Sequence, residues 1–314
     1  MSGRRIWVAG HNGMVGSAVA RCLAACGEEV LTVGRGALDL RDAPATLAWL
    51  QQNQPDAIVL AAAKVGGIYA NDAFPADFIH ENLAIEMSVI HGAHLAGVDR
   101  LVFLGSSCIY PKFAPQPINE DALLCGALEP TNEWYAVAKI AGIKLCQAYR
   151  KQHGRRFISV MPCNLYGPGD NFDPLLSHAM AALIRRFHEA KRAERTEVVV
   201  WGTGTPLREF LHVDDLARAV VFLLDKYDGY EHINCGAGSD VSIAALADII
   251  ARVVDYRGKI VFDPGKPDGT PRKLMDSSRI AALGWKPQIA LQDGIAAIYR
   301  WYLDNKAGGA TLAA

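Results

Sequence analysis

The sequence predicts an α/β protein in which a doubly wound parallel sheet is joined by a smaller, interleaved C-terminal α/β domain. Apolar strand-like runs alternate with helical stretches over roughly the first half of the 314 residues. A glycine-rich turn joins the first strand to the first helix, and beyond residue 165 glycine, proline and aromatic residues gather in clusters. Regular alternation is typical of parallel β-α-β units. We expect the looser second half to supply loops over the carboxyl edge of the sheet.

The individual elements follow from the spacing of apolar residues and from helix-ending glycines. Strands are expected at residues 5–9, 30–33, 57–63, 100–104 and 157–162, and helices at 14–26, 43–53, 76–96, 133–153, 175–191, 214–224 and 243–254. Asn132 is expected to cap the helix that follows it. The first domain is therefore assigned to residues 1–165, the second to residues 166–306, and a frayed tail to residues 307–314.

Composition and charge exclude several classes of protein. The net charge is −1, so broad electrostatic binding to nucleic acid or to an anionic membrane is not expected. Seven cysteines without a Cys-x-x-Cys pair indicate reduced thiols. The N-terminus does not resemble a signal peptide, and no apolar run reaches the roughly 20 residues that span a bilayer. We expect a cytoplasmic protein without a metal site.

The turn Gly10-His-Asn-Gly-Met-Val-Gly16 has the spacing of a dinucleotide-binding loop. The first glycine permits a tight turn, the second lets the backbone approach a pyrophosphate, and the third allows close packing of helix on strand. The N-terminus of the next helix attracts phosphate. The sequence context favours cofactor binding over a mere tight turn, and so predicts a Rossmann-type domain. The expected cofactor-binding residues of this loop are Gly10, His11, Asn12, Gly13, Met14, Val15 and Gly16.

The end of the second expected strand favours NADP(H) over NAD(H). NAD-binding sheets usually carry an acidic residue there for the ribose hydroxyls, whereas this chain has Arg35. A guanidinium suits the additional phosphate of NADP(H), although a solvated surface arginine would fit the same position. Asp39 or Leu40 could lie beside the adenine, and Asp42 could equally well cap the next helix.

Tyr135 and Lys139 stand four residues apart, and so on one face of an expected helix. A lysine ammonium beside a phenol favours the phenolate and lowers its pKa from about 10, which suits proton exchange with an alcohol or ketone. Ser106 and Cys108 follow the strand at 100–104, at the edge where such sheets bind ligands. Cys108 adds a second proton-transfer candidate, since a thiol pKa falls near positive charge. A free cysteine could equally belong to the core.

Together these residues resemble the extended short-chain dehydrogenase/reductase family over nearly the whole chain. Within that family the likeness is to enzymes that epimerise and then reduce a nucleotide-linked 4-keto sugar. The segments that carry it are residues 11–17, 61–68, 105–111, 129–132, 138–144, 164–168, 208–215 and 266–272.

The resemblance implies roles for individual residues. Ser106, Tyr135 and Lys139 would form the catalytic triad. Cys108 would remove protons from C3 and C5 of the sugar, and His178 would return them from the opposite face. The implied substrate-binding residues are Arg186, Trp201, Arg208 and Asp268. The implied cofactor contacts also include Leu104, Gly105, Ser106, Ser107, Lys139, Pro162, Cys163, Asn164, Leu165 and His178.

The implied reaction is epimerisation of GDP-4-keto-6-deoxy-D-mannose at C3 and C5, followed by reduction of the C4 ketone with NADPH. Both carbons flank the ketone, so one carbonyl acidifies their protons, and Ser106 and Tyr135 can donate hydrogen bonds to the enolate oxygen. Another nucleotide-sugar epimerase or dehydratase is an alternative, but dehydratases of this family carry Asp-Glu where this chain has Ser107-Cys108. An inactive NADP-sensing protein is disfavoured because both Tyr135 and Lys139 are present.

The long helices expected at residues 76–96 and 133–153 carry apolar side chains around much of their circumference. A helix that is apolar on more than one face needs a second packing partner. We therefore expect a homodimer through a four-helix bundle, which the resemblance also implies.

Overall fold

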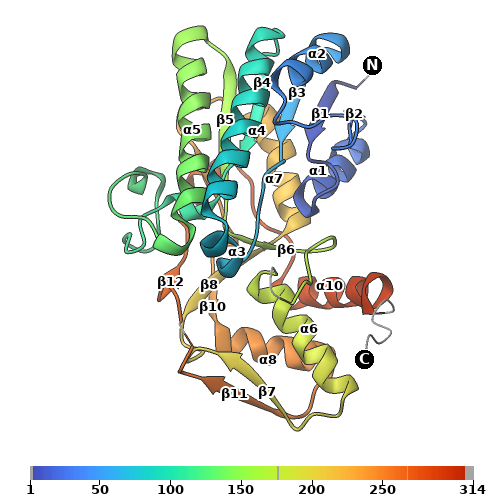
Figure 1. The fold of residues 1–314 in the computed structure, drawn as a ribbon, viewed down its shortest axis with the longest axis vertical. Helices are drawn as coiled ribbons and strands as arrows, with labels where there is room; N and C mark the ends of the chain where they lie inside the picture. Colours follow the sequence, from blue (N-terminus) through green and yellow to red (C-terminus); the bar gives the residue numbers. More distant parts are fainter. Residues whose placement is uncertain (1–2, 175–176, 267, 308–314) are drawn as a thin grey trace.

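The computed structural model describes residues 3–174, 177–266 and 268–307. Its centre is a six-stranded sheet in the order β2-β1-β3-β4-β5-β9, in which every neighbouring pair is parallel (Figure 1). The strands are β1 (Arg5–Ala9), β2 (Glu29–Leu31), β3 (Ala57–Leu60), β4 (Arg100–Leu104), β5 (Arg156–Pro162) and β9 (Ile233–Cys235). The strand order reverses between β1 and β3, which is where doubly wound sheets bind ligands. The predicted fold class is confirmed.

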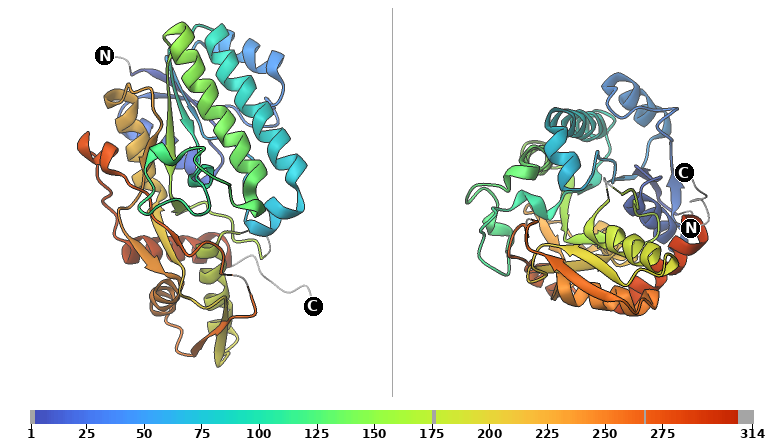
Figure 2. Two further views of the ribbon diagram at one scale, coloured as in Figure 1. Left: turned by 90° about the vertical axis from the view of Figure 1, so that its left-hand side faces the viewer. Right: turned by 60° about the horizontal axis from the view of Figure 1, so that its bottom comes forward.

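Helices cover both faces of this sheet (Figure 2). On one face α1 (Met14–Ala25) packs against α7 (Val213–Lys226). On the other, α4 (Pro75–Leu95) packs between α2 (Ala43–Asn53) and α5 (Glu133–His153). The strands between them are buried along nearly their whole length, as expected of a parallel sheet covered on both sides.

Several elements differ from the sequence-based expectation, most of them by one or two residues at an end. The second strand lies at Glu29–Leu31 rather than 30–33, and the third ends at Leu60 rather than at residue 63. A short helix that the sequence did not reveal, α3 (Ile68–Ala73), precedes α4. Pro75 separates the two helices, because the residue before a proline is disfavoured in helical conformation and Phe74 adopts φ −128° and ψ 49°.

The helix caps were predicted with mixed success. Asp42 accepts a hydrogen bond from the backbone N–H of Ala45 at 3.0 Å, so its capping role is confirmed. Asn132 occupies the N-cap position of α5, but its side chain makes no capping bond, so that expectation was wrong. The 3-10 turn η3 (Pro130–Asn132) leads directly into α5 and leaves Asn132 away from cap geometry. Gly154 ends α5 with a φ of 69°, as expected of a helix-ending glycine.

The second half forms a smaller α/β layer beneath the sheet (Figure 1). Its strands are β6 (Asn164–Tyr166), β7 (Glu197–Trp201), β8 (Leu207–His212), β10 (Asp240–Ser242), β11 (Lys259–Asp263) and β12 (Arg272–Lys273). β8 lies between β10 and β12 and also pairs with β6, whereas β7 pairs with β11. The helices are α6 (Ala179–Arg192), α8 (Ile243–Val254), α9 (Ser278–Ala282) and α10 (Leu291–Asn305). α6 begins later than the expected residue 175, because residues 177 and 178 are not helical; residues 175 and 176 lie outside the described residues.

Two hydrophobic cores hold the molecule together. The larger surrounds the six-stranded sheet, and it includes residues of α7, β9 and α9 that follow the first half in sequence. The smaller is formed by α6, α8 and α10 with the strands beside them. The chain thus returns to the first core after entering the second, although the division at residue 165 stays a prediction. Of the expected tail, residues 308–314 lie outside the described range.

Within residues 3–174, 177–266 and 268–307, the structure contains no helix with both the length and the apolar character needed to cross a membrane.

Candidate functional site

The sequence-predicted site residues gather at the carboxyl edge of the six-stranded sheet. Gly10 follows β1, Gly105 follows β4, and Pro162 ends β5. Since these strands are parallel and adjacent or nearly so, their ends meet at one edge, which faces the second half of the chain (Figure 1). The candidate site therefore lies between the sheet and the smaller layer.

The glycine loop has the geometry of a pyrophosphate cradle. Gly10 has a φ of 94°, and a Cβ there would lie 2.6 Å from the backbone nitrogen of Ala62. A Cβ on Gly16 would lie 2.1 Å from the carbonyl oxygen of Gly10, so the third glycine permits close packing of α1 on β1. A Cβ on Gly13 would touch only that carbonyl oxygen, at 3.5 Å. Gly13 thus leaves its outer side open at the N-terminus of α1, which fits a phosphate group.

Two arginines stand near the end of β2. The Arg35 side chain is 72% exposed, and its guanidinium lies 3.8 Å from a carboxylate oxygen of Glu81 on α4. Arg41, which the sequence analysis did not single out, donates hydrogen bonds to both oxygens of Asp39 and reaches Glu81 at 3.2 Å. These bonds lower the pKa of Asp39 to about 2, so its carboxylate is ionised and paired with Arg41. Leu40 is half-buried against the larger core.

Ser106 and Cys108 leave β4 in a single turn, η1 (Ser107–Ile109). Ser106 caps this turn, and its Oγ accepts a hydrogen bond from the Cys108 backbone N–H at 3.3 Å. Ser106 is half-buried, whereas Ser107 is 4% exposed, so Ser106 is the better placed of the two hydroxyls to reach a ligand. Position 105, just before these residues, requires a glycine, because a Cβ there would lie 2.4 Å from the sulfur of Met161.

Lys139 is held in place on three sides. It is 2% exposed, and its Nζ donates a hydrogen bond to the Leu104 carbonyl at 3.1 Å. The same nitrogen lies 3.1 Å from a carboxylate oxygen of Glu86 on α4 and 4.7 Å from the ring centroid of Phe103. It lies 5.8 Å from the ring centroid of Tyr135, so the predicted pair does come together on α5.

The acidity expected of Tyr135 is not observed. We expected Lys139 to lower its pKa, yet burial raises that pKa well above its usual value, and the charges of Cys108 and Glu86 raise it further. The main physical reason is the burial of the phenol, and in addition the Lys139 ammonium is paired with Glu86. Its positive charge is therefore largely compensated before it can act on the phenol.

Cys108 lies at the site and is 7% exposed. Burial raises the pKa of its thiol, which reverses the direction expected from the sequence. Lys273 of β12, the hydrogen bond with Ser106 and Lys139 all oppose this rise without overcoming it. Lys273 is a residue that sequence reasoning missed, since pairing of β12 with β8 brings it in from far along the chain.

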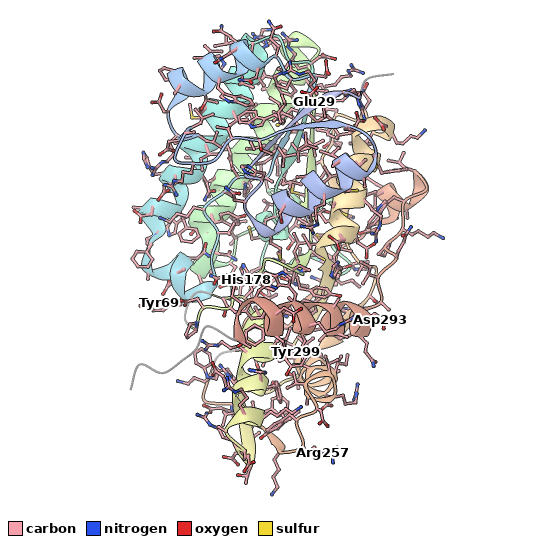
Figure 3. The ribbon with its side chains drawn as sticks, turned by 90° about the vertical axis from the view of Figure 1, so that its right-hand side faces the viewer. Glu29, Tyr69, His178, Arg257, Asp293 and Tyr299 are labelled. Carbon is pink, nitrogen blue, oxygen red and sulfur yellow. The ribbon has the colours of Figure 1, made fainter. Side chains whose placement is uncertain are left out.

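His178 enters from the smaller layer. It is the N-cap residue of α6 and its side chain remains accessible, although the loss of surrounding solvent lowers its pKa. Figure 3 shows His178 at the level where the sheet layer meets α6 and α10.

The segment from Pro162 to Leu165 joins β5 to β6 and is fixed by its backbone. Cys163 donates its N–H to the Cys235 carbonyl at 3.1 Å. The Asn164 side chain donates to the Glu209 carbonyl at 2.8 Å. These bonds hold the segment at the carboxyl edge of the sheet, where its remaining polar atoms can face a cofactor.

The four predicted substrate residues cluster in the smaller layer. The Trp201 ring is 61% exposed, so Trp201 is not a core residue. The Arg186 guanidinium lies 5.9 Å from its ring centroid, and Lys266 Nζ lies 5.4 Å from it. An exposed indole flanked by two cations suits a planar base with attached phosphates.

Arg208 and Asp268 lie beside this cluster. Arg208 donates to the Leu207 carbonyl at 2.8 Å and to the Asp268 carbonyl at 3.4 Å. The Asp268 carboxylate accepts hydrogen bonds from the backbone N–H and the hydroxyl of Thr203, at 2.7 and 2.8 Å. Asp268 therefore joins the two loops that border the exposed indole.

Comparison with known proteins places this geometry in a family. The model of the NAD dependent epimerase/dehydratase family matches residues 6–236. Probable GDP-L-fucose synthase 1 of Oryza sativa subsp. japonica is 60% identical over 96% of this chain and 93% of its own. GDP-L-fucose synthase of Escherichia coli K12 is 52% identical over 98% of both chains.

Solved structures agree. A GDP-L-fucose synthetase from Naegleria fowleri bound to NADP is 27% identical, with a TM-score of 0.88 over 97% of this chain and 95% of that one. A GDP-6-OMe-4-keto-L-xylo-heptose reductase from C. jejuni is 35% identical, with a TM-score of 0.89 over 97% and 99%. The chain belongs to the NAD dependent epimerase/dehydratase family, that is, to the extended short-chain dehydrogenase/reductases that its motifs resemble.

Proposed function

We propose that the protein is a GDP-L-fucose synthase. It would epimerise GDP-4-keto-6-deoxy-D-mannose at C3 and C5 and then reduce the C4 ketone with NADPH to give GDP-L-fucose. The observation that carries the proposal is the position of the Cys108 thiol, which lies within one turn of Ser106 and interacts electrostatically with Tyr135 and Lys273. A reductase needs one proton donor, whereas an epimerase needs a separate base and acid for carbon.

The residues divide the work between the two stages. Cys108 takes the protons from C3 and C5, and Ser106 and Tyr135 donate hydrogen bonds to the oxygen at C4, where negative charge develops. His178 returns a proton to each carbon from the side of the smaller layer, and between the two carbons Cys108 loses its proton to solvent and His178 takes one up. NADPH, when bound, supplies the hydride that reaches C4. Tyr135 then gives its proton to the C4 oxygen.

Cys108 is protonated before the reaction begins. Burial keeps the thiol protonated, so Cys108 needs positive charge nearby in order to act as a base. Lys273 supplies most of that charge, since Lys139 is paired with Glu86. Each proton-transfer group placed in this way is worth roughly 10²–10⁴ in rate.

The cofactor site of the proposal is the glycine loop together with Arg35. The loop leaves room for a pyrophosphate beside Gly13, and the exposed guanidinium of Arg35, which has only a 3.8 Å contact with Glu81, would turn to the additional phosphate of NADP(H). Asp39, bonded to Arg41, is not available to bind ribose hydroxyls as an acid would in an NAD site.

The substrate side of the proposal rests on the exposed indole of Trp201. Its face can stack on the guanine base, with Arg186 and Lys266 beside it for the diphosphate. Arg208 is partly desolvated, as expected of a guanidinium that binds an anionic ligand.

The assembly we propose is a homodimer built on α4 and α5. Met87 and Leu95 of α4 are 61% and 51% exposed, and Trp134 and Val137 of α5 are 45% and 39% exposed. The same two helices of a second copy would cover these side chains in a four-helix bundle. All seven cysteines are free, which together with the need for NADPH supports a place in the cytoplasm.

The test is incubation of the protein with NADPH and GDP-4-keto-6-deoxy-D-mannose, followed by NMR of the product. The proposal expects consumption of NADPH and the ring couplings of an L-galacto sugar. A product that keeps the configuration of the substrate at C3 and C5 would contradict it.

A further inference from the structure

Glu86 is a buried carboxylate beside the catalytic lysine. It lies in the middle of α4 and is 1% exposed, and its Oε1 lies 3.1 Å from Lys139 Nζ, which is itself 2% exposed. Neither carboxylate oxygen has a hydrogen-bond partner of normal geometry within the described residues. Burying a carboxylate without pairing and hydrogen bonds destabilises the folded state, so the Glu86 carboxylate lowers the stability of the protein beside the site.

The fold makes room for this carboxylate. Gly142 stands one turn after Lys139 on α5, where any Cβ would lie 2.8 Å from the Glu86 Oε2 and 2.5 Å from the ring of Phe103. A side chain at position 142 would thus drive the carboxylate away from Lys139. The glycine in a helix interior costs about 1 kcal/mol relative to alanine, and its absence of a side chain is what this contact requires.

The charge of Glu86 bears directly on the proton donor. Both stages of the proposed reaction need Tyr135 protonated, first to hydrogen-bond the enolate oxygen and then to protonate the C4 oxygen. Family members that begin by oxidising an alcohol need the opposite form, a phenolate that accepts a proton. Lys139 alone would favour that phenolate. An anion in contact with Lys139 cancels this effect.

We propose that Glu86 is a positioning residue whose negative charge, paired with Lys139, keeps Tyr135 in its protonated, proton-donating form. The inference rests on the proposed function, and it adds a reason why the site acts as a reductase. Glu86 touches neither substrate nor cofactor; it acts through the lysine.

The surrounding charges are consistent with this role. The titratable groups that face Glu86 are Lys139, Tyr135 and Cys146, all on α5. Cys108 of η1 faces Tyr135, and Lys273 of β12 faces Cys108. Burial raises the pKa of Glu86 to about 7, so its charge is fully present in the alkaline range, where Tyr135 would otherwise begin to lose its proton.

The test compares both directions of the reaction in Glu86→Gln, which keeps the shape of the side chain and removes its charge. The single-turnover rate of NADPH oxidation with the 4-keto sugar should fall at a pH about one unit lower than in the wild type. The reverse oxidation of GDP-L-fucose by NADP⁺ at about pH 9, where Glu86 of the wild type is charged, should become about tenfold faster, because it uses the phenolate. A merely structural role would lower both rates together.

Three controls fix the interpretation. Glu86→Asp keeps the charge, so its rate of NADPH oxidation should fall at the same alkaline pH as that of the wild type. Glu29→Gln makes the same chemical change at the far end of the molecule and should change nothing (Figure 3). If melting experiments show that Glu86→Gln does not fold, Glu86→Met removes the same charge and is judged by the same criteria.

The possible failures are distinguishable. A wild-type enzyme that does not turn over the 4-keto sugar would refute the proposed function. If the wild-type enzyme turns over, two results would overturn the role of Glu86. One is a folded Glu86 variant whose forward rate falls at the same alkaline pH as that of the wild type, and the other is a variant whose forward and reverse rates are reduced by the same factor.

Discussion

The guanidinium of Arg186 lies 5.9 Å from the ring centroid of Trp201, an indole that is 61% exposed. Arg186 is itself fixed by a hydrogen bond to the Val199 carbonyl at 2.7 Å. The pair therefore presents a flat aromatic face next to a held cation, in the smaller layer rather than at the glycine loop. This is the geometry expected of a second nucleotide-binding surface.

Replacing the indole should weaken binding of the nucleotide sugar alone. Stacking of a base on an aromatic side chain is worth about 1–3 kcal/mol, so Trp201→Ala should raise the KM for the GDP-sugar about tenfold or more. The KM for NADPH should change little. Steady-state kinetics with each substrate varied in turn measures both, and Tyr230→Ala, at another exposed aromatic residue, is the matched control. Equal effects on both KM values would argue against Trp201 as the base-binding residue.

Removing the phenolic hydroxyl should stop reduction. Tyr135→Phe cannot donate a proton to the C4 oxygen, so NADPH oxidation with the 4-keto sugar should fall by at least about 10²-fold. The variant should still bind NADPH, which a fluorescence titration of the cofactor measures. Turnover at the wild-type rate would remove Tyr135 from the mechanism.

The cofactor preference should depend on Arg35. Arg35→Ala removes the guanidinium proposed for the additional phosphate, and a charge-assisted contact of this kind is worth about 1.5–3 kcal/mol. We expect the KM for NADPH to rise by about tenfold or more, while the KM for NADH stays within about a factor of three. Arg257→Ala, an exposed arginine at the opposite tip of the molecule, should leave both unchanged (Figure 3). A parallel rise for both cofactors would contradict the phosphate contact.

The dimer should depend on the exposed apolar face of α4. Met87→Lys places a charge among side chains that the proposal buries, and an unpaired buried charge is strongly unfavourable. Sedimentation velocity should therefore show a shift from dimer to monomer. Leu283→Lys, at an exposed leucine outside α4 and α5, should sediment as the wild type does. A wild-type protein that sediments as a monomer would refute the bundle.

Local signals made much of the fold predictable. The helices Ala43–Asn53 and Ile243–Val254 and the strands Arg5–Ala9 and Arg100–Leu104 match the expected bounds. Each is bordered by a residue with a local role, such as Asp42 at its helix N-terminus. The six-residue helix α3 was missed because it is too short to show a periodic pattern.

The electrostatics of the site could not be predicted in the same way. Lys273 reaches Cys108 because β12 pairs with β8, in a register that places Lys273 opposite Arg208. Glu86 reaches Lys139 because α4 packs against α5. Neither contact leaves a pattern in the local sequence. Burial, which also depends on the tertiary fold, reverses the direction of the pKa shifts expected for Cys108 and Tyr135. The residue types of the site were therefore readable from the sequence, whereas their acidities were not.

The most direct test of the proposed function is solvent deuterium incorporation with Cys108 present and absent. Wild-type enzyme, NADPH and GDP-4-keto-6-deoxy-D-mannose in D₂O should yield GDP-L-fucose that carries deuterium at C3 and C5. Cys108→Ser should suppress that incorporation while some reduction of the ketone persists, and Cys125→Ser, at an exposed cysteine, should behave as the wild type. Undiminished deuterium at both carbons in Cys108→Ser would contradict the account.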